Sequence, residues 1–355
     1  MDKSTFSAIL LHWHQHENTR VMPWKGIKDP YKIWLSEVIL QQTRVDQGWK
    51  YYESFIEKYP TIIKLAGAED KEVFKLWEGL GYYNRCKNLL HTARFVAENN
   101  KGMFPSKYEE ILALKGVGPY TAAAIASFAF ALPYAVVDGN VFRVLARVFG
   151  NSTPVDSSEG KAFFTALAQE LLDKKSPGLY NQAIMDFGAT VCKPALPLCS
   201  TCVLQKQCTA FNTGAVNHLP VKEKVLKKKT RWFTYFVFSC KDKTLVSKRT
   251  GSDIWQNLHE FYLVETDEKQ AWTEASVLTT LAAQLDIKYA VVENISALVT
   301  QQLTHQAIKA VFVKVVLKTI PPSLAKLDWL ENTEIEKLAF PKTINQYLSK
   351  TLYVV

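Results

Sequence analysis

The chain has 355 residues, of which 48% are hydrophobic and 22% charged, a composition that favours a folded globular protein over a disordered one. No apolar run is long enough to cross a bilayer, and charges interrupt the longer ones, so the pattern excludes a membrane-spanning protein. The formal net charge of +9 favours a polyanionic partner, either nucleic acid or an acidic membrane surface. The length suggests two domains, because single cores rarely grow beyond about 250–300 residues.

Apolar residues recur at helical spacing in the first part of the chain. The predicted helices cover residues 31–40, 71–80, 108–114, 121–130, 141–149 and 161–172. Residues 221–231 (VKEKVLKKKTR) contain six basic residues and one acidic residue, which predicts a solvated linker. Beyond it we expect strands at 231–240, 243–250, 259–265 and 309–318, and one helix at 274–285. The sequence therefore predicts an all-α domain at 1–220, a basic linker at 221–231 and a smaller α+β domain at 232–355.

Residues 114–130 combine a glycine-containing turn with an alanine-rich helix. Gly116 and Gly118 permit a tight turn and a close approach of the backbone to a ligand. Pro119 suits the first position of a helix, where a missing N–H costs nothing. Amides at such a helix N-terminus can bind a phosphate. The pattern resembles the helix-hairpin-helix motif that grips a DNA backbone, although similar turns also occur in helical hairpins without a ligand.

Four of the six cysteines lie in one short, proline-interrupted stretch, with the spacing C-x6-C-x2-C-x5-C. They are Cys192, Cys199, Cys202 and Cys208. In a reducing compartment, clustered thiols are more often metal ligands than disulfides, and four thiolates can hold zinc or an iron–sulfur cluster. Zinc ribbons usually have two tight C-x2-C pairs, whereas this stretch has one, so the spacing favours a cluster only modestly. The alternative is four unconnected core residues, which is how we interpret Cys86 and Cys240.

Several ordered motifs resemble one family. Residues 116–124 (GVGPYTAAA), residues 136–144 (VVDGNVFRV) and the four-cysteine stretch resemble the helix-hairpin-helix DNA glycosylase superfamily. Residues 35–45 (LSEVILQQTRV) and 79–89 (GLGYYNRCKNL) are similar to the adenine DNA glycosylase (MutY) family. The resemblance covers the chain to about residue 210 and implies a 4Fe–4S cluster on the four cysteines, with a structural role.

Two carboxyl groups fit the chemistry that this resemblance implies. Breaking the N-glycosidic bond of adenine requires a proton donor for the base and an anion to stabilise the sugar cation. Glu37 lies between apolar residues of a predicted helix, so burial should raise its pKa, and the resemblance assigns it as the general acid. Asp138 is a typical helix N-cap, and the resemblance makes it the stabilising carboxylate, with Asn140 positioning water or Glu37. Without the resemblance, Glu37 would read as a solvent-facing helix residue.

Tyr120 occupies the position where related bifunctional glycosylases carry a lysine nucleophile. A lysine amine forms a Schiff base that permits strand cleavage, and a tyrosine hydroxyl does not. The sequence therefore predicts a monofunctional enzyme that leaves an abasic site.

The remaining site residues are implied by the same resemblance. Trp24 and Gln182 would line the adenine pocket, with Lys25 standing where the family often has arginine. The residues expected near an opposing 8-oxoguanine are Gln42, Thr43, Leu80 and Tyr82. The C-terminal domain resembles the Nudix-like lesion-recognition domain of the family, but no Nudix catalytic box is visible, so we expect it to bind rather than hydrolyse.

Residues 301–306 (QQLTHQ) are expected to probe the lesion. Leu303, Thr304 and His305 stand where the family commonly has Phe-Ser-His. Thr304 keeps the hydroxyl and His305 keeps a polar ring, whereas Leu303 loses an aromatic contact. The alternative interpretation is an ordinary turn between strands.

The predicted function is base excision repair: hydrolysis of adenine paired with 8-oxoguanine, or with guanine, in double-stranded DNA. Two other hypotheses stay open at this point: an endonuclease III-like enzyme for oxidised pyrimidines, and a catalytically idle DNA-binding protein with a structural metal. The N-terminus lacks the features of a secretory signal, so we expect a cytoplasmic protein, nucleoid-associated if bacterial. We expect a monomer that does not associate with membranes.

Overall fold

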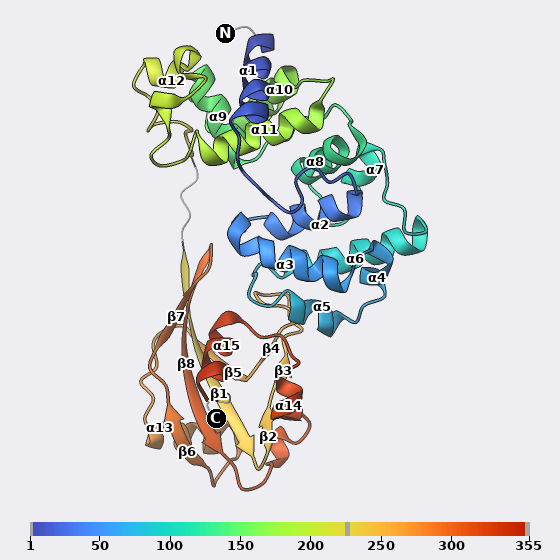
Figure 1. The fold of residues 1–355 in the computed structure, drawn as a ribbon. Helices are drawn as coiled ribbons and strands as arrows, with labels where there is room; N and C mark the ends of the chain where they lie inside the picture. Colours follow the sequence, from blue (N-terminus) through green and yellow to red (C-terminus); the bar gives the residue numbers. More distant parts are fainter. Residues whose placement is uncertain (1–2, 224–227, 352–355) are drawn as a thin grey trace. The chain divides into compact units, whose positions relative to one another are not determined.

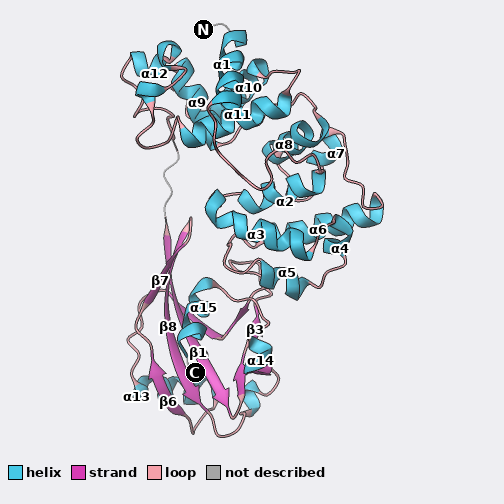
Figure 2. Cartoon of the chain, viewed as in Figure 1, coloured by secondary structure: helices cyan, strands magenta, loops and turns pink. Residues whose placement is uncertain are grey.

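The computed structural model describes residues 3–223 and 228–351. Internal contacts divide the chain into two compact units. The first comprises Met1–Gly67 and Lys87–Val225, and the second comprises Ala68–Cys86 and Leu226–Val355. Figures 1 and 2 show that helices build the first unit and that the strands belong to the second, which confirms the predicted fold class.

The helices of the first unit follow the predicted segments closely. They are α1 (Lys3–His16), α2 (Pro30–Leu40), α3 (Val45–Lys58), α4 (Ile62–Ala66), α6 (Asn84–Asn99), α7 (Tyr108–Leu112), α8 (Pro119–Phe130), α9 (Gly139–Phe149), α10 (Ser158–Leu171), α11 (Pro177–Thr190) and α12 (Thr209–Asn212). Short 3₁₀ turns at Cys199–Thr201 and Gln205–Gln207 lie in the cysteine-rich stretch. The predicted helix at 71–80 is shorter, α5 (Asp70–Leu76), and belongs to the second unit.

N-cap side chains, a proline and a glycine turn determine where the helices around the site begin. Asp29 caps α2 by accepting a hydrogen bond from Tyr31 N (2.9 Å), and Pro30 takes the first position. Asp138 caps α9 by accepting one from Val141 N (2.8 Å), as its sequence context predicts. Before α8, Gly116 has φ +81°, and a Cβ there would lie 2.7 Å from Asn88 Cβ. Glycine is therefore required at this turn.

One hydrophobic core holds α1, α9, α10 and α11 together, and Figure 1 shows these helices gathered at one end of the first unit. Phe6 and Leu10 of α1 pack in this core with Phe164 of α10 and Phe187 of α11, and all four are fully or almost fully buried. Because α11 crosses this core, its polar residues Asn181 and Asp186 are also fully buried.

The second unit is built on a mixed sheet. Its strands are β1 (Lys229–Cys240), β2 (Lys243–Leu245), β5 (Tyr262–Thr266), β6 (Val291–Ile295), β7 (Val299–Gln302), β8 (Gln306–Val316) and β9 (Trp329–Glu331), with a separate pair β3 (Ser247–Lys248) and β4 (His259–Glu260). The helices are α13 (Glu274–Leu285), α14 (Asn332–Ile335) and α15 (Lys342–Thr351). Strands β1 and β8 run parallel at the centre, while β5 and β7 pair antiparallel to β1 and β8 respectively.

The predicted linker at 221–231 is shorter than expected at its C-terminal end. Residues 224–227 lie outside the described part of the chain. Residues 229–231 belong to β1 and pair in register with Gln306 to Ile308 of β8. Arg231 also forms ion pairs with Asp253 and Glu265. From composition alone, the basic residues in 229–231 are expected to be solvated. In the structure, strand pairing and the two carboxylates hold them in the sheet.

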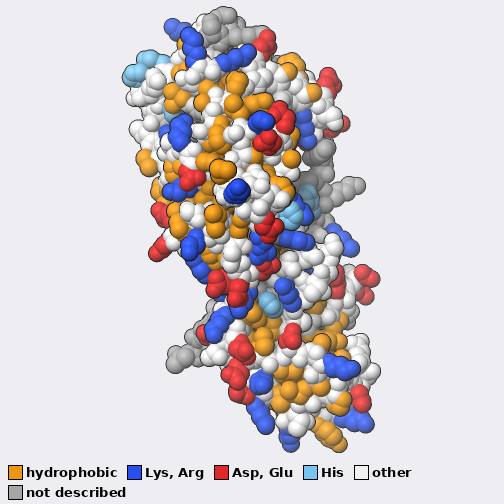
Figure 3. Space-filling view, turned by 90° about the vertical axis from the view of Figure 1, so that its right-hand side faces the viewer, with side chains coloured by type: hydrophobic (Ala, Val, Ile, Leu, Met, Phe, Trp, Pro, Cys, Tyr) orange, Lys and Arg blue, Asp and Glu red, His pale blue; other side chains and the backbone are white. Residues whose placement is uncertain are grey.

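Across residues 3–223 and 228–351, none of the helices combines the length and the apolarity needed to cross a membrane. Figure 3 shows Lys and Arg side chains spread over the visible face and interspersed with acidic and hydrophobic ones.

Candidate active site

A pocket of about 370 Å³ opens within the first unit. Its walls come from α2, α8, α11, the start of α9 and the loop between α1 and α2. The predicted site residues that line it are Trp24, Glu37, Thr43, Tyr120, Asp138, Asn140 and Gln182. Residues from five segments of the sequence thus meet around one cavity.

Glu37 lies in the last part of α2 and is only 6% exposed. The apolar residues around it in α2 are buried as well, so the side chain has little contact with water. Burial, with a smaller contribution from the nearby charge of Asp138, raises the pKa of Glu37 to about 7. A hydrogen bond with Tyr120 opposes the rise. Glu37 can therefore hold a proton near neutral pH.

Asp138 lies across the same pocket at the N-terminus of α9. One carboxylate oxygen accepts from Val141 N, and the other accepts from Asn140 Nδ2 at 2.8 Å. Burial raises the pKa of Asp138, while these hydrogen bonds and the charge of Arg143 work against the rise. Because the hydrogen bonds favour the ionised form, the two carboxyl groups of the pocket have unlike surroundings.

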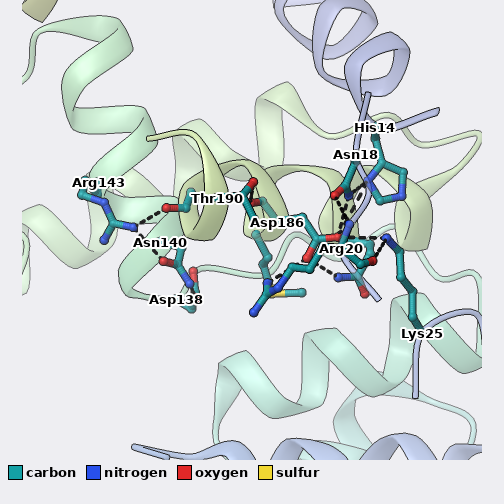
Figure 4. A network of polar contacts seen from close by, with 12 residues as sticks. His14, Asn18, Arg20, Lys25, Asp138, Asn140, Arg143, Asp186 and Thr190 are labelled. Atoms are coloured by element: carbon teal, nitrogen blue, oxygen red, sulfur yellow. Dashed lines mark hydrogen bonds and ion pairs between the residues drawn. The ribbon is translucent and has the colours of Figure 1, made fainter. Parts of the chain in front are cut away.

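Arg143 holds the Asp138–Asn140 pair from behind, as Figure 4 shows. Its Nη2 donates to Asn140 Oδ1 (2.7 Å) and to Gly188 O (2.6 Å), and its Nε donates to Cys192 O (2.7 Å). The guanidinium therefore connects the N-terminal end of α9 to the start of the cysteine-rich stretch.

Tyr120 lies in the first turn of α8 and lines the pocket. Its hydroxyl interacts with Glu37 and lies 3.6 Å from Met185 Sδ, to which it donates. Burial raises the pKa of Tyr120 well above its usual value, so the phenol stays protonated and acts as a donor.

A second polar network surrounds Asp186 of α11, a fully buried residue that the sequence analysis did not single out (Figure 4). Its carboxylate accepts from Arg20 Nη1 (2.8 Å), Asn18 Nδ2 (2.8 Å) and Gln182 Nε2 (3.0 Å), and Lys25 Nζ lies 3.2 Å away. Lys25 thus retains an ionic partner at a position where the family often has arginine. The network fixes the Gln182 amide at the wall of the pocket.

The sequence around Asp186 indicates that this carboxylate is buried. It lies between Met185 and Phe187 in a largely apolar helix, much as Glu37 lies between apolar residues of α2. Arg143 likewise lies in an apolar helix and is 7% exposed. Charged residues in such settings are rarely buried without partners.

The structure does not bring every predicted residue into the pocket. Gln42 follows α2, is exposed and has φ +57°, and it is absent from the pocket lining. Gly116 and Gly118 form the turn before α8. Leu80, Tyr82, Thr304 and His305 belong to the second unit.

Two of these second-unit residues meet. The hydroxyl groups of Tyr82 and Thr304 form a hydrogen bond. Tyr82 is 46% exposed, whereas Leu80 is buried. Thr304 lies in the turn between β7 and β8, which Leu303 N closes by donating to Gln306 O at 2.8 Å. Residues 303–305 thus form a turn between strands, which is compatible with both interpretations of residues 301–306.

The four clustered cysteines line a separate small pocket beside Arg147. All are free thiols of intermediate exposure. Arg147 Nη1 lies 3.5 Å from Cys192 Sγ, and Arg147 O accepts from Cys208 Sγ at 3.5 Å. Within residues 3–223 and 228–351, no three His, Cys, Asp or Glu side chains come together as an ion site. The four-thiol donor set and the shared pocket fit a group bound by four cysteines. Cys86 and Cys240 are buried elsewhere, as expected of packing residues.

Comparison with known proteins identifies the family. The profile of the HhH-GPD superfamily of base excision DNA repair proteins matches residues 35–168, and a NUDIX domain profile matches residues 234–350. The adenine DNA glycosylase of Buchnera aphidicola subsp. Acyrthosiphon pisum (strain APS) is 34% identical over 263 residues, 74% of this chain and 75% of that protein. The chain belongs to the adenine DNA glycosylase (MutY) family.

A relative from another organism and a solved structure are also similar to this chain. The adenine DNA glycosylase of Homo sapiens is 43% identical over 216 residues, 58% of this chain and 39% of the human protein. The solved structure of a thermostable thymine-DNA glycosylase superposes with a TM-score of 0.55 and 31% identity, covering 59% of this chain and 97% of that one. This adenine DNA glycosylase family member is accordingly a DNA glycosylase, and the expected resemblance is confirmed.

The buried Glu37 should lower the stability of the fold at alkaline pH. Its folded-state pKa of about 7 lies above the ordinary value of 4.5, so the unfolded chain binds fewer protons between these values and stability falls as pH rises through that window. We expect Glu37→Gln to raise the free energy of unfolding at pH 8 by up to roughly 3 kcal/mol, with no gain near pH 4.

Denaturant unfolding at the two pH values measures this difference. The exposed Glu109→Gln serves as the control and should give no pH-dependent gain. An equal effect of Glu37→Gln at both pH values would show that the carboxyl is not held protonated by burial.

Proposed function

We propose that this protein removes adenine paired with 8-oxoguanine, or with guanine, from double-stranded DNA, and that it is monofunctional. The observation that carries the proposal is the meeting of Glu37 and Asp138 in one pocket, with the pKa of Glu37 raised to about 7. The names of the relatives, which are adenine DNA glycosylases, support adenine as the base.

The reaction begins with an adenine nucleotide that has left the duplex, because these groups cannot reach a stacked base. Protonated Glu37 donates its proton to a ring nitrogen of adenine, which makes the base a better leaving group. As the bond from base to sugar breaks, positive charge develops on the sugar. Ionised Asp138 stabilises that charge, and Asn140 and Arg143 hold its carboxylate in place.

The environment of Gln182 supports adenine recognition. Its Nε2 donates one hydrogen to Asp186, which leaves the carbonyl Oε1 as its acceptor for a base, beside the second amide hydrogen. An acceptor suits the exocyclic amino group of adenine and disfavours a base with a carbonyl at that position. Trp24, which is buried at the wall, supplies an apolar surface for the ring.

Tyr120 supports a monofunctional reaction. It occupies the place from which a lysine nucleophile would attack the sugar, and its phenol stays protonated. With no amine at this position, base release leaves an abasic site with an intact strand.

The contacts to DNA are assigned by family resemblance and supported by the placement of the residues. The turn at Gly116–Gly118 presents the N-terminus of α8 to a phosphate. By the resemblance, Leu80, Tyr82, Thr304 and His305 of the second unit would contact the 8-oxoguanine. Gln42 and Thr43 of the first unit are assigned to the same base by the resemblance alone. The Tyr82–Thr304 hydrogen bond supports a shared role for two segments that lie far apart in sequence.

We also propose that Cys192, Cys199, Cys202 and Cys208 hold a 4Fe–4S cluster. When bound, the cluster would supply four covalent ties to a stretch with few regular elements. Its neighbours Arg147 and Arg143 would then be held between that stretch and α9.

A glycosylase assay tests the proposed activity. We expect alkali-dependent strand nicking at the adenine in duplexes with A opposite 8-oxoguanine, and none in duplexes with an oxidised pyrimidine. Glu37→Gln should slow adenine release by about 10²–10⁴-fold, the usual contribution of a general acid, whereas Glu109→Gln should not. Nicking without alkali, or a borohydride-trapped adduct on a lysine, would contradict monofunctional chemistry.

The pH dependence of the single-turnover rate follows from the two carboxyl groups. Because Glu37 acts protonated, the rate should fall above about pH 7, by about tenfold per pH unit at high pH. Because Asp138 acts ionised, the rate should also fall in acid.

The Tyr120→Phe variant sharpens this test. Its loss of a hydrogen bond that favours the Glu37 carboxylate should move the alkaline limb to higher pH. An alkaline limb that stays in place in this variant would assign the titration to another group.

Spectroscopy tests the cluster. The purified protein should be brown and absorb light at about 400 nm, as is typical of thiolate-bound iron–sulfur clusters. Cys199→Ser should lose most of this absorption, whereas the control Cys240→Ser should retain it. A colourless protein that contains zinc would favour the alternative metal.

A further inference from the structure

The turn that follows α5 is bonded to a distant stretch of the second unit. Glu78 Oε1 accepts a hydrogen bond from Phe340 N at 2.8 Å. Lys75 Nζ donates to Leu338 O at 2.9 Å and also pairs with Glu78 Oε2 at 3.0 Å. Glu78 is 18% exposed, and main-chain hydrogen bonds to a charged carboxylate are among the stronger ones. We call these two side chains the Lys75–Glu78 clamp.

The stretch that the clamp grips is itself fixed in the core. Phe340 is 1% exposed, and its ring stacks on Phe261 with centroids 6.2 Å apart. His259 N donates to Ala339 O at 2.9 Å. The clamp therefore bonds to a rigid part of the second unit rather than to a surface loop.

The same stretch also holds the chain that leads to Thr304. Thr343, in the first turn of α15, donates from both its backbone N (3.2 Å) and its hydroxyl to Gln301 Oε1. Gln301 lies near the end of β7, directly before the turn that carries Thr304. Residues 338–343 thus contact Lys75 and Glu78, which precede the Tyr82 turn, and Gln301, which precedes the Thr304 turn.

The ring of contacts closes at the Tyr82–Thr304 hydrogen bond. Tyr82 has φ +50°, and Gly79 and Gly81 beside it also have positive φ. A non-glycine residue in the left-handed region is unfavourable unless its surroundings hold it there. The clamp lies one residue before this turn and supplies such a restraint.

We propose that the Lys75–Glu78 clamp and the Thr343–Gln301 contact are positioning elements that hold Tyr82 and Thr304 together and so set the preference for 8-oxoguanine over guanine opposite adenine. This inference rests on the proposed function. None of the four residues touches the pocket of Glu37 and Asp138, so they act on discrimination and not on the bond-breaking step.

The test compares single-turnover rates of adenine release opposite 8-oxoguanine and opposite guanine. We expect Glu78→Ala to lower the ratio of the two rates about fivefold, as loss of one hydrogen bond to a charged group would. Glu78→Gln keeps an acceptor for Phe340 N and should retain most of the ratio. The matched control is Glu69→Ala, which removes an exposed carboxylate paired with Lys71 at the start of the same helix.

Thr343→Val tests the other end of the ring without touching the clamp. It should lower the ratio in the same direction, because it removes the hydroxyl that holds Gln301. An equal loss of rate on both substrates in Glu78→Ala and Thr343→Val would indicate a merely structural role and overturn the proposal, and so would an unchanged ratio in both.

Hydrogen–deuterium exchange distinguishes a failure of the clamp proposal from a failure of the proposed function. In Glu78→Ala, the Phe340 amide and the amides of residues 79–83 and 301–306 should exchange faster than in the wild type and in Glu69→Ala. If the wild type shows no preference for 8-oxoguanine, the proposed lesion specificity fails. Unchanged exchange in Glu78→Ala would by itself reject the clamp.

Discussion

The site depends on keeping one carboxyl group dry next to another that is hydrogen-bonded. Glu37 has lost water on nearly all sides, while Asp138 is held by an amide of its own helix and by Asn140. These surroundings allow two acids of similar intrinsic strength to take opposite protonation states at one pH. The two helices cause this difference in protonation. Helix α2 buries Glu37 within its last part, whereas Asp138 lies at the N-terminus of α9, where the helix dipole favours a negative charge.

Around this pair, the first unit is organised to limit movement. Arg143 and Asp186 each form several hydrogen bonds with groups at the pocket wall and behind it. Partly satisfied networks are costly in a desolvated interior, and fully satisfied ones hold a unique geometry. The same arginine that restrains Asn140 also donates to Cys192 O, so order in the cysteine-rich stretch and order in the pocket are linked through one side chain.

Local signals in the sequence predict much of this arrangement. The helices of the site carry clear caps, such as Asp29 and Asp138, and the Gly-x-Gly turn at residue 116 requires a conformation that only glycine adopts readily. Contacts that depend on distant partners could not be predicted: Asp186 is paired with residues near position 20, and Glu78 with a backbone amide 262 positions away. The basic residues 229–231 looked like linker because their partners, Asp253 and Glu265, were not recognisable as such.

The membership of residues 68–86 in the second unit has a consequence for how the chain is made. The central strand β1 pairs in parallel with β8, which starts 77 residues after the first residue of β1, and non-local parallel pairings form slowly. The early segment 68–86 finds its partners only after residues 338–343 have left the ribosome. During synthesis, the hydrogen bonds of that segment to residues 338–340 therefore form late, after nearly the whole second unit has been made.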